Sequence, residues 1–261
     1  MRPYLALARA VALSALTYRT SFLLSLGGIV FQLVSLLAVW RVLLAESSVS
    51  GFDWPDMRAY LLVAFASGAL VSVFADFRMA ARIQSGLVAL DLVKPVDYQR
   101  ARFAETLGGV WIEVVVIAIV TTVSLLIGGG LRLPPTPELA LFIASMVLLV
   151  PLKFLVVYAS TLACFWTQNF IGVLWARQAI TSLLSGALIP LVYLPGWLAT
   201  LAQWSPFAGL TSTPALIFIG QAHGRQALLL VGVQLLWVLV LWFGARGIWR
   251  AALRQLTVNG G

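Results

Sequence analysis

Long apolar segments follow one another through most of this sequence, and they determine the environment in which the chain can fold. Six of them run over about 21–44, 59–77, 106–127, 139–165, 171–193 and 227–243. A transmembrane helix needs about 20 predominantly apolar residues, which these segments approach or exceed. Only 10% of the 261 residues are charged, against roughly 25% in soluble domains. The pattern predicts an all-α integral membrane protein with six transmembrane helices, in one domain covering residues 1–261.

Positive charge is distributed unevenly between the two ends of these segments. If there are six spans, one side holds Arg2, Arg9, Arg19, the cations of 78–102, Arg177, Arg246, Arg250 and Arg254. The other side holds four arginines mixed with four acids: Arg41, Arg58, Arg132, Arg225, Glu46, Asp53, Asp56 and Glu138. The positive-inside rule therefore predicts that both termini are cytoplasmic. The net charge of +8 fits membrane topology and contact with lipid better than nucleic-acid binding.

Two further apolar regions do not have the pattern of a simple span. Residues 1–19 carry arginines between apolar positions, which predicts a helix lying in the membrane interface. An N-terminal extension of the first span is nearly as good an interpretation. Residues 194–221 contain Pro195, Pro206 and Pro214, which break helices. We expect two short helices there, dipping into the membrane or lying at its outer surface.

The longest polar interval runs over residues 76–105 and mixes five cations with four acids. Ile83, Leu87 and Leu90 are spaced to share one face of a helix over residues 80–93. Gly86 weakens such a helix by about 1 kcal/mol, which indicates a break or a close contact. The pair Lys94–Pro95 ends the helix, and Asp97 is a good N-cap for a helix that continues into the third span.

This interval has two interpretations. A short amphipathic element joined rigidly to two membrane helices is suited to receive a push from a second protein. Composition alone favours a solvated loop that rests on lipid headgroups.

Motifs for catalysis and nucleotide binding are missing from the sequence. It contains no G-x-x-x-x-G-K-[ST] loop for nucleotide phosphates, and its single histidine, His223, excludes an H-E-x-x-H zinc site. The acids Asp91 and Asp97 are six residues apart, with Pro95 between them, which does not suit a magnesium-binding pair. We therefore expect no catalytic residues, no bound metal and no enzyme activity in this chain.

Two ionisable residues lie inside apolar segments, Glu113 in the third and Lys153 in the fourth. Charges within spans are candidates for function, here as a pair that contacts substrate or gates a pathway. The structural alternative is an ion pair between helices, or Lys153 extending its ammonium group along a helix loosened by Pro151. The alternative is the commoner case.

Two motifs in a fixed order carry a resemblance to a known family. The first is I-x-x-G-x-x-x-x-x-L-x-K-P, formed by Ile83, Gly86, Leu92, Lys94 and Pro95. The second is the run LLSGALIPLVYLPGW at 183–197, followed by Pro206-Phe207 and Pro214. With the basic N-terminal helix and six spans, the chain resembles the permease subunits of type-2 ABC exporters, and most closely the bacterial drug and viologen-type export branch.

The resemblance implies a function and partners that composition does not show. The chain would form a pathway with a second permease, identical or a related sister, in the bacterial cytoplasmic membrane. Two separate cytoplasmic ATPases would bind the ATP and Mg²⁺. The coupling helix would include Arg82, Ile83, Gly86, Leu87, Leu90, Asp91, Lys94 and Pro95, and the outer re-entrant gate Pro190, Pro195, Trp197, Pro206 and Pro214. An amphiphilic or hydrophobic cargo suits the apolar spans; the alternative function is a secondary transporter or channel that uses Glu113 and Lys153.

Overall fold

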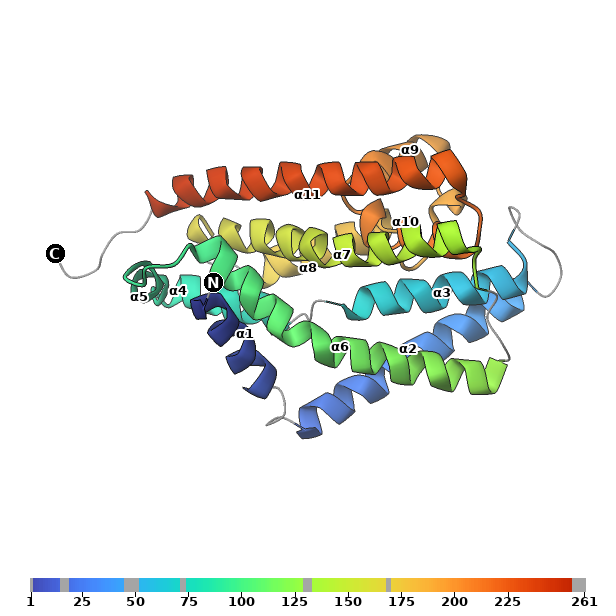
Figure 1. Cartoon of the computed structure of the whole chain (residues 1–261), viewed down its shortest axis with the longest axis horizontal. Helices are drawn as coiled ribbons and strands as arrows, with labels where there is room; N and C mark the ends of the chain where they lie inside the picture. Colours follow the sequence, from blue (N-terminus) through green and yellow to red (C-terminus); the bar gives the residue numbers. More distant parts are fainter. Residues whose placement is uncertain are drawn as a thin grey trace.

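A computed structural model describes residues 2–14, 19–44, 52–70, 74–128, 133–167 and 170–254. Over these residues the protein is a bundle of helices without β-strands (Figure 1). The α-helices are α1 (Arg2–Ser14), α2 (Arg19–Leu43), α3 (Trp54–Ala69), α4 (Phe74–Gln84), α5 (Val88–Leu92), α6 (Tyr98–Gly128), α7 (Thr136–Leu162), α8 (Phe170–Leu184), α9 (Gly196–Trp204), α10 (Ser212–Phe218) and α11 (Gly224–Leu253). Three-residue 3₁₀ turns follow α7 and flank α9.

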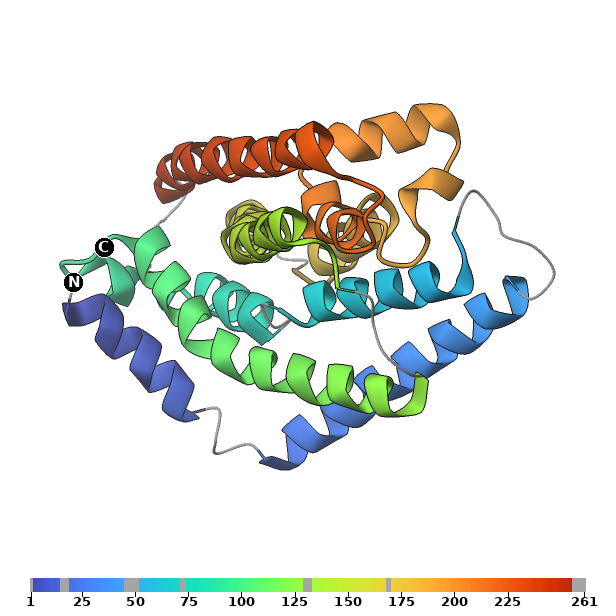
Figure 2. The same ribbon diagram turned by 45° about the vertical axis from the view of Figure 1, so that its right-hand side comes forward.

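Helix α7 forms the centre of the bundle, with α11, α10, α4 and α8 packed around it (Figure 2). Its buried residues Phe154, Leu155 and Tyr158 belong to the largest apolar cluster, together with Ile83 of α4 and Ala245 of α11. The all-helical fold expected from the sequence is confirmed over the described residues.

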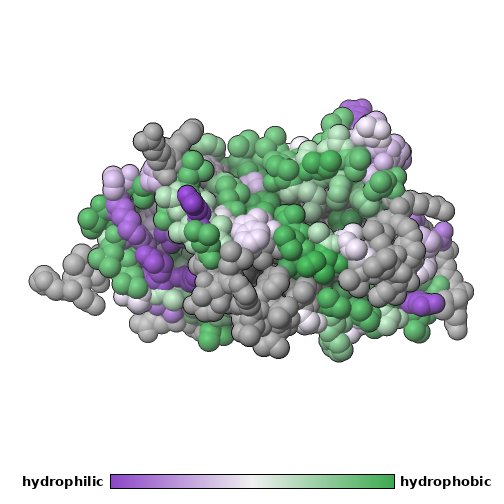
Figure 3. Space-filling view, turned by 60° about the horizontal axis from the view of Figure 1, so that its bottom comes forward, coloured by the Kyte–Doolittle hydropathy of each residue, from purple (hydrophilic) through white to green (hydrophobic). Residues whose placement is uncertain are grey.

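The bundle has two distinct ends. The starts of α1 and α6, the α4–α5 turn and the end of α11 lie toward one end, called here the α5 end (left in Figure 1). Helices α9 and α10 and the start of α7 lie toward the other, the α9 end. Hydrophilic residues gather mainly near the two ends, and apolar residues cover much of the surface between them (Figure 3). This distribution suits a protein surrounded by lipid.

Within the described ranges, two helical stretches are long and apolar enough to cross a membrane, Thr136–Phe165 and Gly224–Leu253. The other expected spans differ from the sequence prediction in two places. The second, expected over 59–77, is not one helix, because α3 ends at Ala69 and α4 begins at Phe74. The fifth, expected over 171–193, ends at Leu184, because Gly186 has a φ of +80°, a left-handed conformation that stops a helix.

The N-terminal helix α1 is separate from α2 and packs along the first turns of α6. Gly108 of α6 permits this contact, because a methyl group there would collide with the backbone carbonyl of Ala8. At its start, α1 also supplies the Tyr4 hydroxyl that accepts a hydrogen bond of 3.2 Å from the Asp97 N–H. Of the two interpretations of residues 1–19, the structure favours a helix distinct from α2, and its location in the membrane interface stays a prediction.

The region 194–221 contains the two short helices that its prolines predict, α9 and α10. Pro195 immediately precedes α9, and Pro206 follows the residue that ends it. Pro214 lies in the first turn of α10, where proline does not interrupt a helix because early N–H groups have no helical partner. The Ser212 N–H donates a 3.0 Å hydrogen bond to the Ser185 carbonyl and so joins this region to the segment that follows α8. In that segment, the Gly186 carbonyl accepts a 2.8 Å hydrogen bond from the Tyr60 hydroxyl of α3.

Candidate functional site

A compact turn at the α5 end joins the second and third apolar regions of the chain. Helix α4 ends at Gln84, Gly86 adopts a φ of +72°, and α5 then runs for five residues. The single helix expected over 80–93 is therefore wrong, whereas the break that Gly86 indicated is confirmed, because its left-handed conformation separates α4 from α5. A second turn leads to α6, where the Asp97 carboxylate accepts a 2.8 Å hydrogen bond from the Arg100 N–H. The predicted N-cap at Asp97 is confirmed.

Asp91 is the buried centre of an ion cluster behind this turn, and its side chain is 3% exposed. Arg82 donates two hydrogen bonds to its carboxylate, from Nε at 2.9 Å and from Nη2 at 2.8 Å. Lys94 donates a third at 2.7 Å, and an Arg102 nitrogen lies 3.9 Å away. The bidentate contact fixes the orientation of the Asp91 carboxylate relative to the Arg82 guanidinium as well as their distance. One carboxylate therefore ties together α4, α5 and α6.

The electrostatics of the cluster favour the charged form of Asp91. Burial alone would raise the pKa of its carboxyl, but hydrogen bonds from Lys94 and Arg82 and the charge of Arg102 hold it below the ordinary value of 3.8. Arg102 also contacts Glu105 at 2.8 Å. There burial dominates and raises the pKa of Glu105, despite the opposing charge of Arg102. The Asp91 carboxylate is therefore ionised around neutral pH.

The outer face of the turn is apolar and exposed. Leu87 is 44% exposed, Leu90 62% and Val93 82%. Leu92 and Pro95 are also exposed, whereas Ile83 of α4 is buried against α7. The expectation that Ile83, Leu87 and Leu90 share one face is therefore wrong, because the break at Gly86 directs Ile83 into the core. We call the exposed set Leu87, Leu90, Leu92 and Val93 the α5 surface.

Helix α6 connects this turn to α11 at the same end of the molecule. The Tyr98 ring stacks on Trp249 with centroids 4.3 Å apart and planes 1° apart. The amide of Gln99 donates a 3.1 Å hydrogen bond to the carbonyl of Trp242. The start of α6 is therefore attached to α11 by a ring stack and a hydrogen bond.

Lys153 lies where α3 stops, part-way along the bundle. Its ammonium group donates to the carbonyls of Ser67 at 3.3 Å, Gly68 at 2.5 Å and Leu70. The last carbonyls of a helix have no partner within the helix and carry partial negative charge, so a cation there stabilises the end. Lys153 thus caps α3 from α7. Glu113 is buried in α6. That Glu113 and Lys153 act as a pair, and that either lines a pathway, stays a prediction.

The five residues expected in the outer gate lie in or beside the α9–α10 region. Trp197 is 72% exposed at the start of α9, Pro190 precedes a 3₁₀ turn and is buried, and Pro214 is buried in α10. Helices α9 and α10 lie at the end of the molecule opposite α5 (Figure 1).

The sequence pattern did not predict a buried polar network around Gln234. Gln234 of α11 donates 2.9 Å hydrogen bonds to the carbonyls of Ser145 and Gly209, and it accepts one of 2.8 Å from the Ser145 hydroxyl. Gln234 is 1% exposed and Ser145 0%. A glutamine within the apolar run 227–243 was the available signal. The network fixes α11 to α7 and to the turn before α10.

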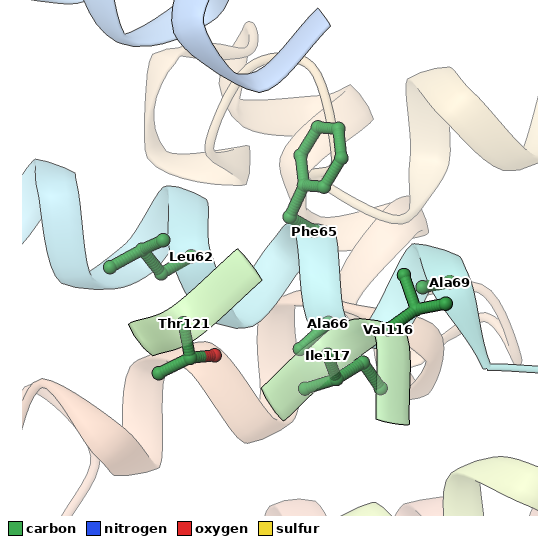
Figure 4. Close-up of a pocket in the computed structure, with 7 residues that line it drawn as sticks. All are labelled: Leu62, Phe65, Ala66, Ala69, Val116, Ile117 and Thr121. Atoms are coloured by element: carbon green, nitrogen blue, oxygen red, sulfur yellow. The ribbon is translucent and has the colours of Figure 1, made fainter. Parts of the chain in front are cut away.

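A small hollow between α3 and α6 is lined almost entirely by apolar side chains (Figure 4). They are Leu62, Phe65, Ala66, Ala69, Val116, Ile117 and Thr121. Among the described residues there is also no group of three or more His, Cys, Asp or Glu side chains that could hold a metal ion.

Comparison with known proteins identifies the family. The model for the ABC-2 family transporter protein matches residues 29–260, which is most of the chain. The chain belongs to the ABC-2 transporter family. Among curated proteins, none matches it.

Membership of the ABC-2 family shows what kind of protein contains the turn at α5. The ABC-2 domain is a permease domain and not a nucleotide-binding domain, so this chain is a multi-pass membrane subunit of an ABC transporter. The match covers both the Asp91 cluster and the α9–α10 region. The coarse prediction of an ABC-type permease is confirmed.

Proposed function

We propose that this ABC-2 permease is the membrane subunit of an ATP-driven exporter and that the α5 surface binds a separate cytoplasmic ATPase. The observation that carries the proposal is the contrast between the two sides of α5. Leu90 and Val93 are 62% and 82% exposed on one side. On the other side, Asp91 is buried and bonded to Arg82 and Lys94. Exposed apolar side chains that are held in place by a buried ion cluster are suited to fill a groove in a partner protein.

A loop that only rests on lipid headgroups would need no such base. Exposed apolar side chains at a protein's end are a characteristic of interaction surfaces when they gather in one patch. The bidentate contact from Arg82 orders α5 relative to α4 before any partner binds, which lowers the entropy cost of binding. These features favour a protein partner.

The contacts around Asp91 supply a route for force from the ATPase. Closure of two ATPases on ATP would displace α5, and the ion cluster would carry the displacement to α4 through Arg82. The capped start of α6 would carry it to α11 through the Tyr98–Trp249 stack. Rotation of these helices against a second permease would open the pathway to the outside.

The remaining features of the transporter follow from the family and from the sequence pattern. We place the chain in the bacterial cytoplasmic membrane with six spans and cytoplasmic termini, so the α5 end faces the cytoplasm. The α9–α10 region would then form the outer gate. The second permease is an identical or sister chain, and an amphiphilic or hydrophobic small molecule of the drug or viologen type is the proposed cargo.

The test is purification of the tagged full-length chain from its bacterial host in mild detergent, with mass spectrometry of the bound proteins. Wild type should recover an ATPase that contains a nucleotide-phosphate loop. Leu90→Glu should lose it, because a carboxylate would be buried in an apolar groove. Leu133→Glu, at a 73% exposed leucine near the α9 end, is the matched control and should retain it.

Three results would contradict the proposal. One is the absence of an ATPase in every sample, and another is equal recovery with Leu90→Glu. The third is cargo movement in vesicles that never responds to ATP, which would favour a secondary transporter or channel that uses Glu113 and Lys153.

A further inference from the structure

Helix α11 carries an exposed stripe that is apolar along most of its length and basic at the α5 end. Leu236, Leu239 and Phe243 are 57%, 49% and 63% exposed. Arg246, Arg250 and Arg254 follow at spacings of three and four residues, which continues the same face of the helix. The opposite face, with Gln234 and Ala245, is buried against the bundle. We call the exposed set the α11 stripe.

The arginines of the stripe are available for an outside anion. Within the described part of the chain, Arg246, Arg250 and Arg254 form no ion pair. The ion pairs in that part join Arg82, Lys94 and Arg102 to Asp91 or Glu105. The Arg246 guanidinium lies over the Trp242 ring at 5.6 Å, and its Nε is buried without a hydrogen-bond partner. Arg250 and Arg254 are exposed. Trp242 thus holds one cation in place at the edge of the apolar part.

Spacing along the helix matches the dimensions of a bilayer. The ten residues from Leu236 to Arg246 rise about 15 Å, which is half of a hydrocarbon core of about 30 Å. Arg225, at the other end of the helix, lies 21 residues before Arg246, or about 31 Å away. Leu236 is therefore at the depth of the bilayer centre when Arg246 is at the headgroup level of one leaflet.

The surface beside the arginines is open. A methyl group built at Gly247 meets no atom within 4 Å, and Gly247 falls between Phe243 and Arg250 on the stripe. No described helix covers this half of α11 on its outer side (Figures 1 and 2). Phe243 and Arg250 therefore flank a position on the helix surface that no neighbouring side chain fills.

We infer that the α11 stripe binds an anionic phospholipid, with its phosphate on Arg246 and Arg250 and its acyl chains along Phe243, Leu239 and Leu236. Arginine is well matched to phosphate because its planar fork donates two parallel hydrogen bonds. A second copy of the chain is a poorer match in charge. The carboxylates of Asp91, Asp97 and Glu105 at this end are already bonded to groups of their own chain.

The test is native mass spectrometry of the purified full-length chain in neutral detergent, titrated with dioleoyl phosphatidylglycerol, dioleoyl phosphatidylcholine or inorganic phosphate. Phosphatidylglycerol should bind most tightly. Each arginine near a lipid surface contributes about 1 kcal/mol, which is about fivefold in affinity. The single variant Arg250→Gln should therefore weaken phosphatidylglycerol binding about fivefold. The double variant Arg246→Gln/Arg250→Gln should weaken it about 30-fold. Arg225→Gln is the control, because Arg225 is a single arginine at the other end of the same helix. It should change the affinity for phosphatidylglycerol less than twofold.

Several outcomes would overturn the inference. Binding of phosphatidylcholine as tight as that of phosphatidylglycerol would be one such outcome. Competition by inorganic phosphate at a concentration equal to that of phosphatidylglycerol would be another, because the site would then recognise a free anion. Equal loss in Arg225→Gln and Arg250→Gln would show general charge attraction only. A change in oligomeric state of the double variant at unchanged lipid affinity would assign the stripe to a second copy.

Discussion

The guanidinium of Arg82 donates two hydrogen bonds, of 2.8 and 2.9 Å, to the carboxylate of Asp91 across the left-handed turn at Gly86. The contact folds α5 back on α4 although the two helices are not continuous. It therefore connects the two helices directly, although Gly86 interrupts the backbone helix between them. The coupling proposed for this permease depends on this connection.

Replacement of Asp91 by Asn should loosen the turn. The buried carboxylate would be lost while Arg82 and Lys94 keep their charges, and we expect unfolding to become easier by about 1–3 kcal/mol. Thermal or chemical unfolding of the purified chain in detergent measures the change. Asp53→Asn is the control, because Asp53 is exposed and its side chain makes no capping hydrogen bond. Equal effects of the two substitutions would contradict the structural role of Asp91.

The contribution of Asp91 should also depend on pH in a defined direction. Its pKa in the folded protein is lower than the ordinary 3.8, so the unfolded chain binds a proton more readily than the folded one. The stabilisation is fully present above the ordinary value and is lost as the pH falls through the lowered folded pKa. The difference in unfolding free energy between wild type and Asp91→Asn should be constant from about pH 8 to pH 5 and shrink below about pH 4. A difference that already changes between pH 8 and 6 would point to another group.

Replacement of Lys153 by Met should free the last carbonyls of α3. We expect a loss of about 1–3 kcal/mol in unfolding free energy and faster amide exchange in the last turn of α3. Val147→Met, at a 65% exposed position on the same helix, is the control. If Lys153 lines the transport pathway instead, Lys153→Met would change transport while stability and exchange stayed as in wild type.

Gly108 and Gly109 offer a test of the contact between α1 and α6. A methyl group at Gly108 meets the Ala8 backbone, whereas one at Gly109 meets nothing within 4 Å. Gly108→Ala should therefore displace α1 and cost about 1–3 kcal/mol. Gly109→Ala should be neutral or gain up to about 1 kcal/mol, because alanine is the better helix former. Unfolding of the two variants in detergent would separate them, and equal stability would show that α1 does not depend on this contact.

Sequence patterns predicted much of this fold, because they record local preferences of the chain. The prolines at 195, 206 and 214 predicted two short helices, and Asp97 predicted the start of α6. The family was also recognisable from the motif at Ile83–Pro95, and the family match supports it.

What the sequence did not predict depends on contacts between distant segments. The end of α3 lies inside an apolar run, and Lys153, more than 80 residues away, supplies the cation that satisfies its carbonyls. Burial of Ile83 and exposure of Leu90 follow from the turn at Gly86 and from packing on α7. The Gln234–Ser145 pair likewise joins two helices whose contact no local pattern specifies.

Crosslinking from Val93 tests the proposed coupling most directly. The only cysteine, Cys164, is buried, so a Cys164→Ala chain that carries Val93→Cys presents a single thiol at the α5 surface for a short heterobifunctional crosslinker. Leu133→Cys in the same background is the control near the α9 end. In membranes from the bacterial host, the account predicts a covalent adduct with an ATPase from position 93 and none from position 133. An ATPase that co-purifies with the chain but crosslinks from position 133, or from neither position, would contradict it.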